Sequence, residues 1–399
     1  MNQSKPSIYV YGMAISGLNP TIYGGLFGNA TRAVGLAINL AKLGHEIYLE
    51  VENNFNSNLK SEELPVFLKL IRESQRQDFL CNADVLLISC TNIQSFHKLF
   101  GRDPYLDHPC KIIASCFDLK QSIDLERLRG KVKFITFNNS KQKRMWDGRK
   151  NSIPSLEIPY GVNETVQVDD AIIDVQKPSA LWMGAIRRTD MLQRIVHFAR
   201  VNTNCKVTVV TRAITDNTIE SHKRGGLDNP YADFTGRDSL EVFDEIVEEL
   251  CGIKTPSNID FLGPMEGQNH IIQGQHTIGL DFSRFPSQSH DNTKILDYLR
   301  SGLCVICDKG TPSYRFVEET GNGAVVSPNF DDNEIRNAYE WCLKIGTLEN
   351  RKSVAAFVRK KYGWDTLALI YSELACKATR PTKVTLAKRA VRWIRRTKP

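Results

Sequence analysis

Short apolar runs alternate with amphipathic segments along the chain, and this alternation predicts parallel strands joined by helices. The apolar runs have the length expected of strands that are buried on both faces. We expect strands at 8–14, 47–51, 84–90, 111–116 and 132–137, and then at 180–184, 206–211, 259–264, 278–282, 304–307 and 324–326. The chain is therefore predicted to be an α/β protein built on doubly wound parallel sheets.

The opening segment predicts a strand–helix–strand unit. Residues 29–43 place apolar side chains at helical spacing, and Gly44 ends this helix before the strand at 47–51. The loop before the helix contains Gly17, Gly24, Gly25 and Gly28. Their spacing is not the Gly-x-Gly-x-x-Gly of dinucleotide-binding proteins, which weakens the case for a Rossmann oxidoreductase.

Residues 278–326 carry the strongest functional signal, because polar side chains gather where a predicted strand leads into a helix. Asp291 or Asn292 can cap a helix that Gly302 ends. A helix that starts at the carboxyl end of a parallel strand presents free N–H groups and a positive dipole end, which suit a phosphate or a sugar hydroxyl. Asp297 lies about a turn and a half into this helix, where it can accept hydrogen bonds from ribose hydroxyls.

Polar residues also follow strands in the first half. Asp118 comes after the strand at 111–116, and Asn138 and Asn139 come after the strand at 132–137. Because the carboxyl ends of parallel strands line the crevice of a doubly wound sheet, we expect these side chains at that edge.

The length and composition are those of a globular protein with two domains. The 399 residues exceed the roughly 250–300 at which single cores stop growing. No run of about 18 apolar residues occurs, and residues 1–7 lead directly into a strand without a signal-peptide core, so we expect a cytoplasmic protein. The ten cysteines lack disulfide or zinc spacing, which favours reduced, mostly buried thiols.

The positive charge is concentrated at one end of the chain. Residues 377–399 contain nine Lys or Arg and no acid, which leaves 43 basic against 45 acidic residues elsewhere. The neutral body argues against a nucleic-acid-binding protein. Residues 383–396 can form a basic amphipathic helix that lies on an anionic membrane surface. A disordered basic tail or an internal amphipathic helix are the alternatives.

The segment 289–302 resembles the donor-binding motif of nucleotide-sugar-dependent glycosyltransferases with the GT-B fold, of the glycosyltransferase family 4 type. That motif is Glu, seven residues, Glu, then Ala-x-Ala-x-Gly and a strand. Asp297 occupies the second acidic position and Gly302 the glycine, whereas Ser289 replaces the first Glu. The replaced carboxylate usually touches the sugar, so the resemblance leaves the donor sugar and the stereochemical course open.

The run Asn292, Thr293, Lys294 is similar to a variant of the fold in which Lys precedes the acidic residue by three positions. The resemblance implies that this run, with Ser289 and His290 beside it, lines the donor site. A second departure lies at Phe117, where many members have His before Asp. If the reaction inverts the anomeric carbon, Asp118 can act as general base; the alternative is a helix cap or turn residue.

Three further segments add donor contacts by the same resemblance. Arg187 and Arg188 follow the first strand of the second half, where a basic residue of the family contacts the diphosphate. Gly263 follows the strand whose succeeding backbone holds the base. Gly25 belongs to the loop that approaches the donor phosphate or the acceptor, although its glycines can equally form a plain turn.

The resemblance also implies a domain organisation. The run 156–163 resembles the signature that ends the amino-terminal domain, and 357–374 resembles a closing helix that crosses back to it. As plain periodicity, Trp364, Leu367, Ala368, Ile370 and Tyr371 predict one apolar face on that helix. The following division is expected: an N-terminal Rossmann-like domain 1–163, a linker 164–178, a nucleotide-sugar-binding domain 179–357, the closing helix 358–376 and the basic tail 377–399.

Together these features predict a hexosyltransferase-like enzyme that moves a sugar from a nucleotide-diphosphate donor to a hydroxyl of a glycan or lipid-linked acceptor. We expect no metal and no cofactor besides the donor as co-substrate. The alternatives are a sugar-nucleotide epimerase on the same fold, a Rossmann oxidoreductase, and a catalytically inactive GT-B homologue that binds a partner. Transfer to an acceptor, rather than interconversion of free sugar nucleotides, separates the first alternative from the prediction.

Overall fold

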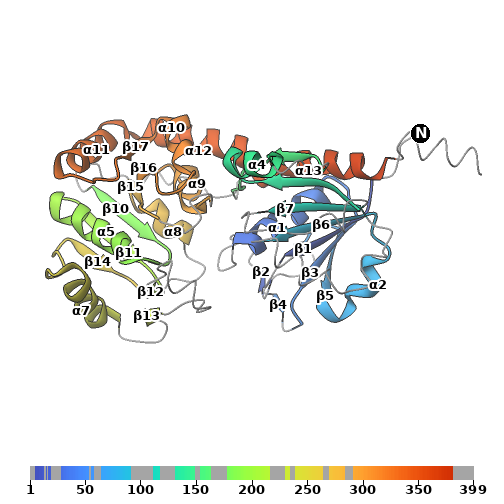
Figure 1. Ribbon diagram of the computed structural model, residues 1–399, viewed down its shortest axis with the longest axis horizontal. Coiled ribbons are helices and arrows are strands. Elements are labelled where there is room, and N and C mark those ends of the chain that lie inside the picture. Colours follow the sequence, from blue (N-terminus) through green and yellow to red (C-terminus); the bar gives the residue numbers. More distant parts are fainter. Residues whose placement is uncertain are drawn as a thin grey trace, which may run out of the picture.

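Two parallel sheets, each with helices on both faces, form the two lobes of the protein, which lie side by side in Figure 1. We call the lobe of the seven-stranded sheet the N-terminal lobe and that of the six-stranded sheet the C-terminal lobe. The computed structural model describes residues 5–12, 15, 17–18, 28–53, 55–57, 64–90, 111–116, 131–148, 153–162, 178–215, 230–233, 239–263, 269–283 and 291–380.

The N-terminal sheet has the order β5-β3-β1-β6-β7-β8-β9, and all its pairings are parallel. Alternate side chains of its strands face two separate hydrophobic clusters, as expected for a sheet buried on both faces. The strands are β1 (Ile8–Gly12), β3 (Ile47–Val51), β5 (Leu68–Arg72), β6 (Val85–Cys90), β7 (Lys111–Cys116), β8 (Val132–Phe137) and β9 (Ser155–Glu157). A second, two-stranded parallel sheet pairs β2 (Gly17–Leu18) with β4 (Asn56–Ser57).

The C-terminal sheet has the order β14-β11-β10-β15-β16-β17 and is also parallel throughout. Its strands are β10 (Ser179–Met183), β11 (Lys206–Val210), β14 (Ile259–Phe261), β15 (Ile278–Asp281), β16 (Cys304–Asp308) and β17 (Gly323–Val326). Cys304 and Cys307 belong to different clusters, so they point to opposite faces of β16. A short antiparallel pair joins β12 (Ala213–Thr215) to β13 (Pro230–Asp233).

Amphipathic helices cover the sheets, because each buries its apolar stripe and leaves its polar stripe outside. The N-terminal lobe has α1 (Gly28–Lys42), the 3-10 turn η2 (Glu73–Gln75), α2 (Arg76–Leu80) and α4 (Ser140–Asp147). The C-terminal lobe has α5 (Thr189–Val201), α7 (Ser239–Cys251), α8 (Asn269–Gly274), α9 (Thr293–Arg300), α10 (Tyr314–Thr320) and α11 (Asp332–Ile345). Helices α5 and α11 contribute to one cluster of the C-terminal sheet, and α9 and α10 contribute to the other.

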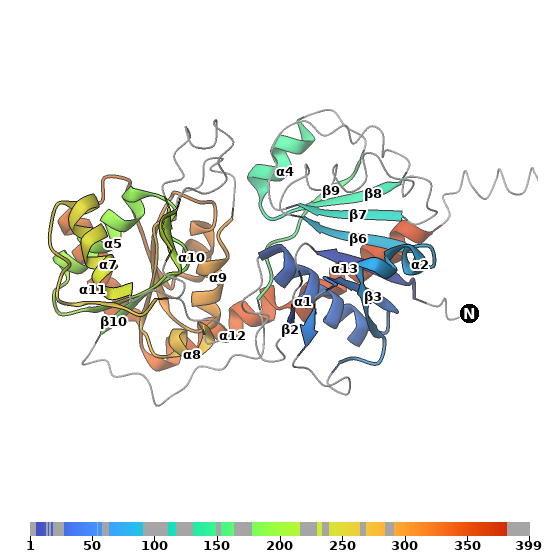
Figure 2. The same cartoon turned by 90° about the horizontal axis from the view of Figure 1, so that it is seen from below.

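Two consecutive helices connect the lobes. Helix α12 (Leu348–Tyr362) packs on α9, and α13 (Trp364–Thr379) packs on α1 and on the N-terminal sheet, as Figure 2 shows from below. Within the N-terminal lobe, the hydroxyl of Tyr371 lies 3.0 Å from Ser115 Oγ and 2.8 Å from Thr136 Oγ1. Helix α13 is therefore fixed on the first sheet by buried hydrogen bonds as well as by apolar contacts.

Several predicted elements differ from the structure. The segment predicted as one closing helix contains a break at Gly363, whose backbone pairs with Val162. Ile370 was wrongly assigned to the apolar face of this helix. It is 37% exposed, whereas Trp364, Leu367, Ala368 and Tyr371 are buried. The reason is geometric: at about 100° per residue the four buried side chains fall within an arc of about 100°, and Ile370 lies about 60° outside the edge of that arc.

The predicted α/β class with parallel, doubly wound sheets is confirmed. The strands at 47–51, 111–116 and 132–137 have the predicted bounds. The other predicted strands are present with bounds shifted by a few residues at their ends.

Candidate functional site

The candidate site lies at the carboxyl ends of three neighbouring strands of the C-terminal sheet. Strands β10, β15 and β16 are adjacent and parallel, so they end at the same edge. At this edge β15 ends in Asp281 and β16 in Asp308, both buried, and β10 is followed by Gly184 at φ 113°. Two buried carboxylates here require cationic or N–H partners, which the neighbouring loops and helices supply.

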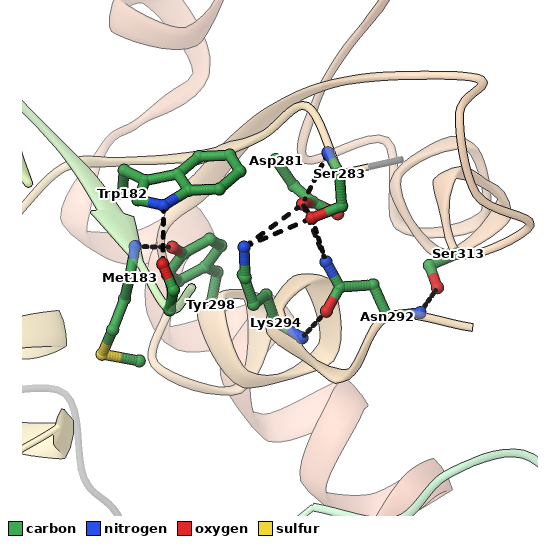
Figure 3. Close-up of polar contacts among 9 residues, drawn as sticks. Trp182, Met183, Asp281, Ser283, Asn292, Lys294, Tyr298 and Ser313 are labelled. Carbon is green, nitrogen blue, oxygen red and sulfur yellow. Dashed lines mark hydrogen bonds and ion pairs between the residues drawn. The ribbon is translucent and has the colours of Figure 1, made fainter. Parts of the chain in front are cut away.

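The start of α9 is fixed by a hydrogen-bonded cluster of Asp281, Ser283 and Asn292, drawn in Figure 3. Asn292 is the N-cap, and its side-chain oxygen accepts from the backbone N–H of Lys294 at 3.2 Å. The Asn292 side-chain NH₂ donates to Asp281 Oδ1 at 2.8 Å and to Ser283 Oγ at 2.6 Å. The Ser283 hydroxyl in turn donates to Asp281. One buried carboxylate thus orients the residue that begins the helix.

The side chain of Lys294 extends into this cluster. Its Nζ lies 3.6 Å from the centroid of the Trp182 ring, donates to Ser283 Oγ at 3.2 Å, and lies 3.9 Å from Asp281 Oδ1 (Figure 3). A Cβ atom on Gly184 would lie 2.9 Å from Lys294 Cε, so the absence of a side chain there makes room for the lysine. An aromatic face, a hydroxyl and a carboxylate therefore hold one ammonium group at the first turn of α9.

Burial controls the charge of this group. It lowers the pKa of Lys294 to about 8, although the negative charge of Asp281 acts in the opposite direction, and the positive charge of Arg187 adds to the lowering. Burial also raises the pKa of Asp281, against the effect of Lys294. The negative charge of a polyanionic ligand beside Lys294 would raise its pKa and so stabilise the protonated ammonium.

The two candidate arginines after β10 have different surroundings. Arg188 is the residue before α5, and its Nε donates to Asp190 at 2.9 Å. Arg187 is exposed, and its effect on the pKa of Lys294 shows that its charge acts on the same site. Of the two, Arg187 is the arginine whose charge acts on Lys294.

Asp297 lies one turn further along α9, on the side toward the N-terminal lobe. Its Oδ1 lies 3.2 Å from Arg300 Nε, and its side chain is 30% exposed. Burial raises the pKa of Asp297, and Arg300 opposes this effect. Tyr160 of the N-terminal lobe has a raised pKa, first by burial and then by the charge of Asp297.

The remaining predicted residues divide into two groups. Thr293 is the first residue of α9, next to Lys294, and Gly263 follows β14 with φ 66°, at the same sheet edge but two strands away from β10. Four predicted residues lie outside the described residues: Gly25, Asp118, Ser289 and His290.

Sequence reasoning missed the residues that surround Lys294. Asp281 and Ser283 stand at the carboxyl end of an apolar strand, so the rule that singled out Asn138 applied to them as well. Trp182 carried no signal, because a Trp inside an apolar run is more often a core residue. Trp182 is indeed fully buried, and its Nε1 donates to Gly184 O at 2.9 Å. It therefore contacts Lys294 with the face of its ring and not with its N–H group.

Among the described residues, no three or more His, Cys, Asp or Glu side chains are grouped as metal ligands. Within the same residues, no helix is both long enough and apolar enough to cross a membrane.

Comparisons with known proteins define the class of fold. No protein-family model and no curated protein matches the sequence. AviGT4, a glycosyltransferase involved in avilamycin A biosynthesis, is 16% identical over 94% of this chain and 98% of its own, with a TM-score of 0.61. A glycosyltransferase from Rickettsia africae is 14% identical over 95% and 100%, with a TM-score of 0.59.

A third similar structure contains a sugar nucleotide. Anabaena HepE in complex with UDP-glucose is 12% identical over 93% of this chain and 100% of its own, with a TM-score of 0.59. At these identities the likeness concerns the fold. The chain has the GT-B fold of these glycosyltransferases over nearly its whole length.

Proposed function

We propose that the protein is a glycosyltransferase that moves a sugar from a nucleotide-diphosphate donor to a hydroxyl of a glycan or lipid-linked acceptor, without a metal ion. The observation that carries the proposal is the Lys294 ammonium, held at the first turn of α9 where three parallel strands end. The shared fold supports it, and so does the presence of UDP-glucose in the structure of HepE.

The chemistry assigned to the site is stabilisation of the leaving group. As the bond between the anomeric carbon and the diphosphate breaks, negative charge grows on the diphosphate oxygens. Lys294, Arg187 and the positive dipole end of α9 can neutralise this charge, and these groups support a reaction without a metal. Asp297 can bind the ribose hydroxyls. Asp118 remains the proposed general base for an inverting reaction.

The donor site is tested with a panel of nucleotide sugars. We expect at least one to stabilise the wild type thermally, and we expect Lys294→Met to weaken its binding by about tenfold to a hundredfold, the loss for a charge-assisted hydrogen bond. Calorimetric titration measures this. Lys206→Met is the matched control, because Lys206 is 64% exposed at the amino end of β11, the opposite edge of the same sheet.

Each outcome of this titration has a clear meaning. Equal affinity in the Lys294→Met variant would place the donor elsewhere, and a wild type that binds no nucleotide sugar would contradict the proposal. Product analysis then distinguishes transfer to an acceptor from epimerisation of the donor. Binding without turnover would favour an inactive homologue, the alternative suggested by Ser289 and Phe117.

We also propose a cytoplasmic enzyme whose basic segment 377–399 contacts the anionic inner face of a membrane. The composition of that segment supports this, because nine basic residues stand there without an acid. The described part of this segment contains Lys377, in the last turn of α13, and Arg380, directly after that helix.

A further inference from the structure

Asn138, directly after β8, is held by arginines from both lobes. In the N-terminal lobe, Arg32 of α1 is fully buried, and its Nη1 donates to Asn138 Oδ1 at 2.8 Å. From the C-terminal lobe, Arg315 of α10 donates through Nη2 to the Asn138 carbonyl oxygen at 3.0 Å. The Asn138 side chain is thus held within its own lobe, and its carbonyl oxygen connects that lobe to the other.

The guanidinium group of Arg315 also binds Asp291, the residue before the N-cap of α9. Arg315 forms a bidentate pair with Asp291, Nη1 to Oδ1 at 2.7 Å and Nη2 to Oδ2 at 3.0 Å. Asp291 is 6% exposed and stands next to Asn292, the N-cap of α9. Ser313, at the start of α10, accepts from the Asn292 backbone N–H at 2.6 Å and donates to Asp291 Oδ1 at 3.3 Å.

We propose that Arg315 is a positioning residue that couples the N-terminal lobe to the first turn of α9 and thereby to Lys294. One planar group donates in two directions at once, to Asp291 in its own lobe and to Asn138 in the other. The bond to Asn138 exists only while the lobes keep this arrangement. Separation of the lobes breaks the hydrogen bond from Arg315 to Asn138. The Arg315 side chain is then less fixed, and so is its pair with Asp291, the residue before the N-cap of α9.

The functional part of this inference rests on the proposed function, because it takes α9 as the donor-binding helix. The coupling itself does not depend on that function, since it consists of hydrogen bonds from Arg315 to Asn138 in one lobe and to Asp291 in the other. Two measurements therefore test the two parts separately: amide hydrogen exchange without ligand, and the affinity for a nucleoside diphosphate.

Amide hydrogen exchange of the full chain tests the coupling. The Asn139 side chain caps α4 by accepting from the Gln142 N–H at 2.9 Å, so Gln142 reports on the loop after β8. In Arg315→Met we expect exchange to rise about tenfold at Gln142 in one lobe and at Lys294 in the other, from the loss of charge-assisted bonds. Unchanged exchange at Gln142 would overturn the proposal.

A control and a conservative variant sharpen this result. Arg359 donates from Nε and Nη2 to the Arg300 carbonyl oxygen, at the far end of α9, and contributes nothing across the lobes at Asn138. Arg359→Met should leave Gln142 unchanged. Arg315→Lys should keep the pair with Asp291 and protect Lys294, yet still raise exchange at Gln142, because a single ammonium lacks the two-directional fork. A rise at Gln142 in Arg359→Met would show general loosening and would count against the coupling.

Calorimetric titration with UDP, ADP and GDP tests the consequence for donor binding. The diphosphate that the wild type binds best should bind Arg315→Met about tenfold more weakly. Equal affinity would overturn the link to the donor site. If none of the three binds the wild type, the proposed function fails, and the exchange experiment alone decides the coupling.

Discussion

The ammonium of Lys294 is the residue on which the proposed chemistry depends, and its surroundings make its charge sensitive to pH. Burial lowers its pKa to about 8, and the attraction of Asp281 opposes this. The face of Trp182, 3.6 Å away, also favours the charged form. The group is therefore charged at neutral pH but close to losing its proton.

This pKa predicts how donor binding depends on pH. Below about pH 8 the lysine of the free protein is protonated and attracts the diphosphate; above it the neutral amine does not, so affinity should fall as pH rises through this range. Titration of a nucleoside diphosphate across the interval measures the fall. In Lys294→Arg the charge persists, and we expect a flat profile. A flat wild-type profile would show that Lys294 does not bind the phosphates.

The sequence located Lys294 and Asn292, because both belong to one short motif with recognisable capping and charge. It did not locate Trp182 or Arg315, whose roles come from contacts between segments far apart in the chain. Nothing local to Arg315 distinguishes it from a solvated arginine of an ordinary helix. Its partner Asn138 was singled out only for its position after a strand.

At the scale of elements, the break between α12 and α13 explains how the chain passes from one lobe to the other. Gly363 ends α12, and the Val162 N–H donates to Tyr362 O at 2.8 Å while the Trp364 N–H donates to Val162 O at 3.2 Å. Trp364 then packs edge-on against Tyr160, with ring centroids 5.3 Å apart.

Two glycines make room for the Trp364 ring. A Cβ atom on Gly161 would lie 2.3 Å from Trp364 Cε3, and one on Gly35 would lie 2.6 Å from the same ring. We expect Gly161→Ala to lower the free energy of unfolding by about 1–3 kcal/mol, the cost of overpacking, as measured by denaturant titration.

Two further variants test the cause of this loss. Gly148→Ala is the control, because its Cβ would meet nothing closer than 3.4 Å and its φ of −63° suits any residue. Trp364→Leu should reduce the effect of Gly161→Ala, so that the double variant is more stable than the sum of the single losses implies. Additive losses would mean that the ring and the glycine do not interact.

The elements that the sequence predicted well are those with strong local patterns. Apolar runs of five or six residues gave the central strands, and the helical spacing of residues 29–43 gave α1 to within one residue at each end. The short strands β9, β12 and β13 were not predicted, because three or four residues carry too little periodicity. The break at Gly363 depends on a pairing with Val162 that no local pattern encodes.

At the scale of the whole molecule, charge is distributed unevenly between the body and one terminal segment. Residues 1–376 carry 43 basic and 45 acidic side chains, whereas 377–399 carry nine basic ones. The excess of positive charge that would attract an anionic surface therefore lies at one end of the chain. Lys377 is itself partly neutralised by Glu373, at 2.6 Å.

Removal of residues 381–399 should abolish binding to vesicles that contain phosphatidylserine, because about 1 kcal/mol per basic residue is lost near the surface. Co-sedimentation with vesicles measures this, and nucleotide binding should be retained. Raising the salt concentration should release the full chain in the same way. A truncated protein that still sediments with the vesicles would place the membrane contact elsewhere.

Helix α13 covers the N-terminal sheet although almost the whole C-terminal lobe separates the two in the sequence. On a ribosome, strands β1 to β9 emerge long before residues 364–379, so the face of this sheet that α1 and α13 cover together lacks α13 until synthesis has passed both lobes. We therefore expect the amino-terminal half to be less stable by itself than in the full chain. Expressed by itself, it would expose the hydrophobic surface that Trp364, Leu367 and Tyr371 bury.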